Sequence, residues 1–198
     1  MGFVIGYLTS LIINFFVHKE QESKYSLKYK ILISVIIEVL FLLSYMINGL
    51  TIKYLYTIIL VVLLSIVFFV DLKCFVIPDS MNLLLFIFSL YLVLFTDNYL
   101  WSHIIEIIGV LIFNLLILII TVFFYKIKNI EIIGFGDIKL LFSLGLAFGL
   151  TYFSYSLLIS SITALFVELI ILKKQRKIIP YGPYLVIGFL AIWLINIF

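Results

Sequence analysis

The chain has 198 residues, of which 66% are hydrophobic and 12% are charged, and its formal net charge is +3 at pH 7. This composition excludes an ordinary soluble domain and predicts an integral membrane protein. Each helical span needs about 20 apolar residues, so a chain of this length has no room for a separate soluble domain. We therefore predict one membrane domain, residues 1–198, with an all-α fold.

Eight apolar segments follow one another along the chain and predict a polytopic helical bundle of about eight transmembrane helices. They cover residues 3–17, 31–47, 55–70, 81–95, 104–125, 138–150, 153–172 and 181–198. The division of 138–172 into two spans yields pieces that are short for a bilayer. The first segment lacks a basic leading region and a small-residue cleavage site, which favours a retained helix over a signal peptide.

The basic residues indicate which side of the membrane each loop occupies. If eight helices cross in turn, all of the 13 lysines and arginines except Lys53 fall in loops on one side. The positive-inside rule makes that side cytoplasmic and places both termini outside. The basic residues are scattered, with no aromatic and basic platform among them, so we expect contact with the lipid bilayer and no nucleic acid partner.

Two aspartates stand where an apolar segment meets a lysine-bearing loop, and both fall on the predicted cytoplasmic face. Asp71 follows the third segment, and Asp137 immediately precedes the sixth. Two carboxylates within hydrogen-bonding distance do not both ionise easily, so they are expected to share one proton. Such a pair can activate a water molecule and polarise a peptide carbonyl, which is the chemistry of an aspartyl protease.

The alternative is that each aspartate only caps or flanks a helix, and Asp137 could N-cap the sixth span. The context of Asp137 favours catalysis, because Gly134 and Gly136 allow the loop to approach a neighbouring helix closely. Lys73 and Lys139 each follow one of the aspartates by two positions. A lysine there could position a carboxylate, although contact with lipid phosphates explains it equally well.

Three sequence blocks occur in order at residues 70–79 (VDLKCFVIPD), 134–141 (GFGDIKLL) and 179–185 (IPYGPYL). Together they resemble the type IV prepilin peptidases, a family of membrane aspartyl proteases with a Gly-x-Gly-Asp motif. The likeness covers about residues 55–198, and residues 1–54 form additional N-terminal helices. It implies that Asp71 and Asp137 are the catalytic pair, with Gly134, Gly136 and Lys139 in the active-site loop.

The resemblance also implies a substrate, the precursor of a type IV pilin or pilin-like subunit, whose short basic leader is removed at the cytoplasmic face of the inner membrane. Asp79 and Glu131 could form a negative rim that attracts this leader, although Asp79 is most simply the start of a helix. The candidate substrate contacts are Lys73, Asp79, Glu131, Pro180, Gly182 and Pro183. Gly182 is expected to make a tight turn under the active site.

The N-terminal part differs from the longer members of that family, which carry a cytoplasmic segment with paired cysteines between their first two spans. Here the corresponding loop is only about residues 18–30 and has no cysteine, and Cys74 is the one cysteine of the chain. In the longer members this segment is linked to methylation of the new N terminus. We therefore expect peptidase activity alone, with no metal, no cofactor and no methyltransferase activity.

Two other functions remain open from the sequence. Intramembrane proteases of the presenilin or signal-peptide-peptidase type also use Gly-x-Gly-Asp, but their first aspartate usually follows a tyrosine, whereas Val70 precedes Asp71 here. The non-enzymatic alternative is a small transporter that uses buried acids as an ion relay. It would depend on Glu38 or Glu168, which lie inside apolar segments, as does Glu106.

Overall fold

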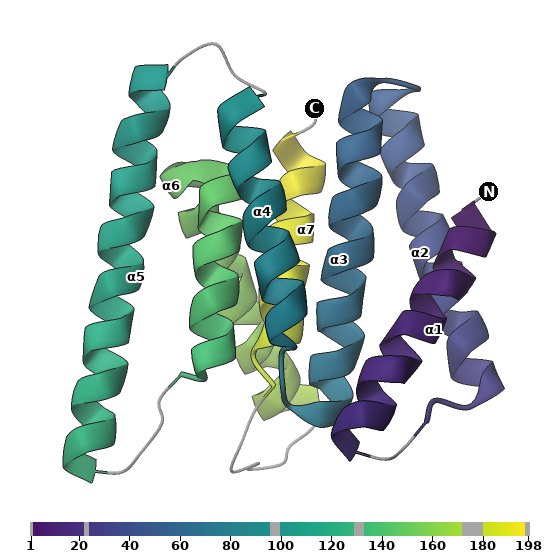
Figure 1. Ribbon diagram of the computed structural model, residues 1–198, viewed down its shortest axis with the longest axis horizontal. Coiled ribbons are helices and arrows are strands. Elements are labelled where there is room, and N and C mark those ends of the chain that lie inside the picture. Colours follow the sequence, from purple (N-terminus) through teal and green to yellow (C-terminus); the bar gives the residue numbers. More distant parts are fainter. Residues whose placement is uncertain (1, 22–23, 96–99, 129–132, 172–179, 197–198) are drawn as a thin grey trace.

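The computed structural model describes the whole chain except residues 1, 22–23, 96–99, 129–132, 172–179 and 197–198, and within the described part every regular element is helical (Figure 1). The helices are α1 (Gly2–Gln21), α2 (Leu27–Asn48), α3 (Ile52–Cys74), α4 (Asp79–Phe95), α5 (Leu100–Lys128), α6 (Phe135–Leu165), the π-helical segment η1 (Phe166–Ile171) and α7 (Gly182–Asn196). The prediction of an all-α fold is confirmed.

Most of these helices are apolar over a length that suits a bilayer. Among the described residues, five helices are long and apolar enough to cross a membrane, and α4 and α7 are shorter apolar helices. Many large apolar side chains point outward, including Phe15, Ile105 and Leu169. Such a surface is costly in water but not in lipid, where helices also satisfy their backbone hydrogen bonds internally. The chain is therefore a membrane protein.

The chain reverses direction inside α6, at Gly149. This glycine has φ 72° and ψ 164°, which is outside the helical region and is rarely adopted by residues with a side chain. The halves before and after it fold back on each other. This is seen at Gly145, where a Cβ would lie 3.3 Å from the ring of Phe153 in the other half. In an unbroken helix residues this far apart would be separated by about 12 Å. The sequence predicts a division of this region between residues 150 and 153, and the structure breaks the helix nearby, at Gly149.

The helices pack so that α3, α6 and α7 form the centre of the bundle (Figure 1). Helices α1 and α2 pack on one another and on α3, while α4 and α5 both pack on α6. Helix α7 contacts both α3 and α6. Its backbone approaches that of α6 closely at Gly188, where a Cβ would overlap the carbonyl oxygen of Ser156. Small residues permit this kind of close packing between membrane helices.

One end of the bundle collects the segments that carry the three sequence blocks. The end of α3 and the starts of α4, α6 and α7 lie together at the lower end in Figure 1. The opposite end holds the break in α6 and the C-terminal end of α7. Residues that are far apart in the sequence can therefore meet at the lower end.

Candidate active site

Asp71 lies in the last turn of α3 and is only 4% exposed. The helix ends three residues later, because Phe75 adopts the left-handed conformation (φ 56°, ψ 30°), and its N–H donates a hydrogen bond of 2.9 Å to the carbonyl oxygen of Asp71. The chain then turns and enters α4, which begins at Asp79 directly after the buried Pro78. This turn keeps Asp71 at the lower end of the bundle, facing the neighbouring helices.

The carboxylate of Asp71 contacts the beginning of α7. Its Oδ2 accepts a hydrogen bond of 3.1 Å from the backbone N–H of Gly182, the first residue of that helix. The first N–H groups of a helix have no partner within the helix and carry partial positive charge, so they stabilise a negative carboxylate. Only glycine fits here, because a Cβ at position 182 would lie 2.7 Å from Oδ2 of Asp71.

Asp137 lies in the first turn of α6 and is half-buried. The N-cap of α6 is Gly134, so the suggestion that Asp137 itself is the N-cap is wrong. The Asp137 carboxylate instead interacts with the backbone N–H of Gly134, as an acidic residue at this position of a helix commonly does. The two carboxylates are close enough for the charge of Asp71 to act on Asp137.

The loop between α3 and α4 packs between the two glycines that border the aspartates. Ile77 is buried there, and a Cβ at Gly136 would lie 3.3 Å from the Cβ of Ile77. A Cβ at Gly182 would lie 3.2 Å from Cδ1 of the same side chain. Asn82, in the first turns of α4, donates a hydrogen bond of 3.2 Å to the carbonyl oxygen of Gly136. The three sequence blocks therefore meet around Ile77.

Comparison with known protein families matches residues 58–169 to the type IV leader peptidase family. This chain belongs to that family. The match includes Asp71 and the Gly-x-Gly-Asp block and confirms the family resemblance seen in the sequence. No curated protein and no solved structure matches the chain. Its activity class is accordingly that of a leader-peptidase-like protease.

The two lysines near the aspartates contact other groups. The ammonium group of Lys139 lies 2.6 Å from Oδ1 of Asp79, and both side chains are exposed. The ammonium group of Lys73 lies 4.3 Å from the centre of the Tyr25 ring. The observed ion pair joins the starts of α4 and α6, and the cation–π contact joins α3 to the segment between α1 and α2.

No sequence motif marks Tyr25, yet it connects the N-terminal helices to the end of α3. Its backbone N–H donates to Oδ1 of Asn14 at 2.8 Å, and its hydroxyl donates to the carbonyl oxygen of Phe69 at 2.9 Å. Burial raises the pKa of Tyr25 to about 12, which keeps this hydroxyl protonated as a donor even in mildly alkaline solution. Only the fold reveals this role, because an isolated tyrosine in a loop has no distinctive pattern.

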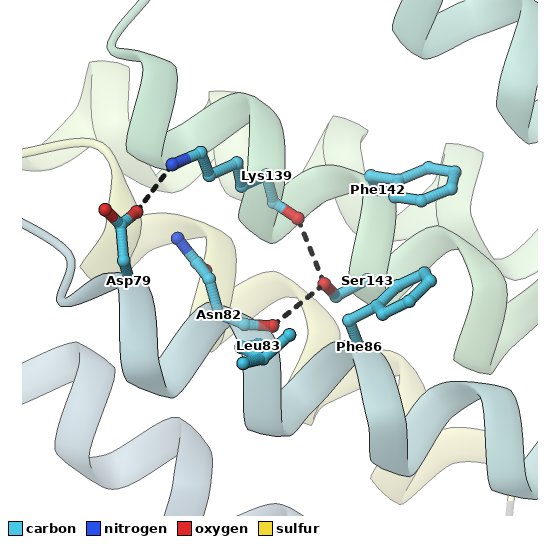
Figure 2. A pocket seen from close by; sticks show the side chains of 7 residues that line it. All are labelled: Asp79, Asn82, Leu83, Phe86, Lys139, Phe142 and Ser143. Atoms are coloured by element: carbon cyan, nitrogen blue, oxygen red, sulfur yellow. Dashed lines mark hydrogen bonds and ion pairs between the residues drawn. The ribbon is translucent and has the colours of Figure 1, made fainter.

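A pocket of about 460 Å³ lies between α4 and α6, and Asn82, which lines it, also donates the hydrogen bond to Gly136 (Figure 2). Its polar end carries the ion pair between Asp79 and Lys139, and its apolar wall includes the stacked rings of Phe86 and Phe142, 5.6 Å apart. Figure 2 shows all of its lining residues, which are Asp79, Asn82, Leu83, Phe86, Lys139, Phe142 and Ser143. The pocket can therefore receive a group that is polar at one end and apolar along the rest.

Of the remaining predicted site residues, the two prolines lie around the start of α7, and the glutamate lies in a part of the chain that the structure does not describe. Glu131 lies outside the described residues. Pro180 and Pro183 are buried on either side of Gly182. The expected tight turn at Gly182 is instead the start of α7, since the carbonyl oxygen of Tyr181 accepts the N–H groups of the first helical turn.

Proposed function

We propose that this protein is a membrane aspartyl endopeptidase that removes the short basic leader from type IV prepilins or pilin-like precursors. The observation that carries the proposal is that Asp71 contacts the N terminus of α7 beside Ile77, and that Ile77 also packs on Gly136, the residue before Asp137. Two interacting carboxylates suffice to cleave a peptide bond with water. Membership of the leader peptidase family supports the same activity.

In the proposed reaction the two aspartates have different roles. The Gly182 N–H stabilises the negative form of Asp71, so Asp71 is the base that takes a proton from the attacking water. Asp137 holds the shared proton and donates a hydrogen bond to the carbonyl oxygen of the scissile bond. The water oxygen forms a bond to the carbonyl carbon, and the proton that Asp71 took then passes to the leaving amine as the carbon–nitrogen bond breaks. The products are the free leader, which has a new carboxyl end, and the shortened subunit, which has a new N terminus.

The proposed orientation puts the aspartates at the cytoplasmic face of the inner membrane and both termini outside. Its support is that eight of the nine described lysines lie at the same end of the bundle as the two aspartates; they belong to the end of α1, the start of α2 and the residues just before it, the end of α3, the end of α5 and the start of α6. The reversal at Gly149 allows α6 to count as two crossings, which makes eight in total. In this orientation a basic leader would remain in the cytoplasm while the following apolar segment enters the bilayer.

The direct test is co-expression of the protein with candidate pilin-like precursors, followed by N-terminal sequencing of the product. We expect the leader to be lost at one bond. Precursors that stay uncut, despite confirmed membrane insertion of the protein and several different leaders, would contradict the proposed substrate class.

We also propose that the pocket between α4 and α6 receives the precursor next to the cleavage site. Asn82 connects this pocket to the carbonyl of Gly136, which directly precedes Asp137 in the chain. The exposed carboxylate of Asp79 lies at the polar end and is paired with Lys139, so a basic residue of the leader would share this carboxylate with Lys139 or replace it as the partner. The aromatic wall beyond it suits the apolar segment that follows the leader.

Replacing Leu83 with tryptophan should fill this pocket and raise KM for the precursor about tenfold, because overpacking a binding site costs about 1–3 kcal/mol. The value of kcat should change little, since the aspartates are untouched. The matched control is Leu84→Trp, an exposed neighbour on α4 that is not part of the pocket lining. An equal change in KM for both variants, or none for Leu83→Trp, would contradict a substrate role for the pocket.

A further inference from the structure

Two side-chain contacts tie the start of α7 to its neighbours, one to the second half of α6 and one to η1, with one on each side of Gly182. The hydroxyl of Tyr184 donates a hydrogen bond of 2.8 Å to Oε1 of Glu168, in a buried position. The hydroxyls of Tyr181 and Ser161 lie 3.3 Å apart. Gly182 lies between the two tyrosines in the sequence, and its N–H donates the hydrogen bond to Oδ2 of Asp71. The helix end that contacts Asp71 is thus itself held by its neighbour.

Glu168 is an unusual residue for such a contact, because it is only 5% exposed. It lies inside an apolar segment of the sequence, and the structure buries it. A buried carboxylate is unfavourable unless it is hydrogen-bonded. Its Oε1 accepts the hydrogen bond from Tyr184, whereas its buried Oε2 has no hydrogen-bond partner among the described residues. Glu168 also lies in the π-helical segment η1, and π-helical turns are frequent at functional sites.

We propose that Glu168 is a positioning residue for peptide cleavage, acting through Tyr184. Tyr184 and Gly182 belong to the same first turn of α7, so a hydrogen bond that fixes one also fixes the other. Glu168 therefore keeps the Gly182 N–H at its 3.1 Å distance from Asp71. A displacement of about 1 Å at a reacting group can reduce the rate about a hundredfold. This inference rests on the proposed catalytic role of Asp71.

The kinetic test compares Tyr184→Phe with two replacements of Glu168, using leader removal from a precursor by the purified full-length protein. We expect Tyr184→Phe and Glu168→Leu each to lower kcat about tenfold with little change in KM, and the double variant to lose no more than either. Glu168→Gln keeps an acceptor for Tyr184 and should stay within about threefold of the wild type. The matched control is Thr163→Val, since that hydroxyl bonds only carbonyl oxygens of its own helix in the described contacts.

Three results would overturn the proposal. Full activity of Tyr184→Phe would show that the hydrogen bond is not needed. This variant keeps the aromatic ring, so it can still be measured if Glu168→Leu fails to fold. A loss in Glu168→Gln as large as in Glu168→Leu would assign the effect to charge rather than to the hydrogen bond. An equal loss in Thr163→Val would assign it to general packing of α6.

A second measurement needs no substrate and separates this proposal from the proposed function. Thermal unfolding in detergent is followed for Tyr184→Phe, Asp71→Ala and the double variant. If Tyr184 holds Gly182 against Asp71, the decrease in Tm of the double variant is smaller than the sum of the single decreases. Additive decreases would overturn the positioning role. Coupled decreases in a protein that cuts no precursor would leave the contact standing and refute only the proposed function.

Discussion

Replacing Asp71 with asparagine should abolish leader removal, with kcat/KM lower by at least about a thousandfold. Asparagine has the same shape and can still accept the hydrogen bond from Gly182, so the fold is preserved, but it cannot take a proton from water. Asp137→Asn should cause a comparable loss, because the pair can no longer share and transfer a proton. The measurement is the rate at which the purified variants produce the shortened precursor.

The control for these variants is Glu20→Gln, which removes an exposed acid near the same end of α3, where its charge acts on Cys74. We expect this variant to cleave the precursor at the wild-type rate. An aspartate variant that inserts normally and still cleaves would remove that aspartate from the proposed pair. A loss in Glu20→Gln as large as in Asp71→Asn would point to a general effect of negative charge at this end.

Replacing Gly182 with alanine should reduce kcat/KM about a hundredfold or more and also lower stability by about 1–3 kcal/mol. The added methyl group would lie 2.7 Å from Oδ2 of Asp71 and 3.2 Å from Cδ1 of Ile77, and both neighbours are buried. Either α7 or the Asp71 side chain must move, which breaks the hydrogen bond between them. Cleavage kinetics and thermal unfolding in detergent measure the two effects separately.

The comparison for Gly182→Ala is Ile187→Ala, a change on the exposed face of the same helix. It should leave kcat/KM unchanged and alter stability only slightly, since an outward apolar side chain has few protein contacts to lose. Wild-type activity of Gly182→Ala would show that the close contact between α7 and Asp71 is unnecessary for the reaction. A loss confined to stability would assign Gly182 a purely structural role.

Much of the fold was predictable because membrane helices depend on local properties of the chain. A run of apolar residues satisfies its own backbone hydrogen bonds wherever it lies in lipid, so the segments 31–47 and 55–70 closely match α2 and α3. The family was also predictable from local sequence, because its motifs are short blocks of neighbouring residues. The predicted roles of Asp71 and Asp137 in catalysis remain to be tested by the variants above.

The partners of the site residues were not predictable, because they depend on which helix faces pack together. Lys139 pairs with Asp79, 60 positions away, although Asp137 is its neighbour in sequence. Asp71 meets Gly182 across 111 positions, and Glu168 is buried against Tyr184, 16 positions away.

The sequence by itself determined the membrane class, the approximate helix positions and the family, since each follows from the order of residues along a single segment. Only the tertiary structure decided that the starts of α4, α6 and α7 converge on the end of α3. The physical reason is that apolar helices are all equally soluble in lipid, so their arrangement depends on close packing at small residues such as Gly188 and on a few buried hydrogen bonds.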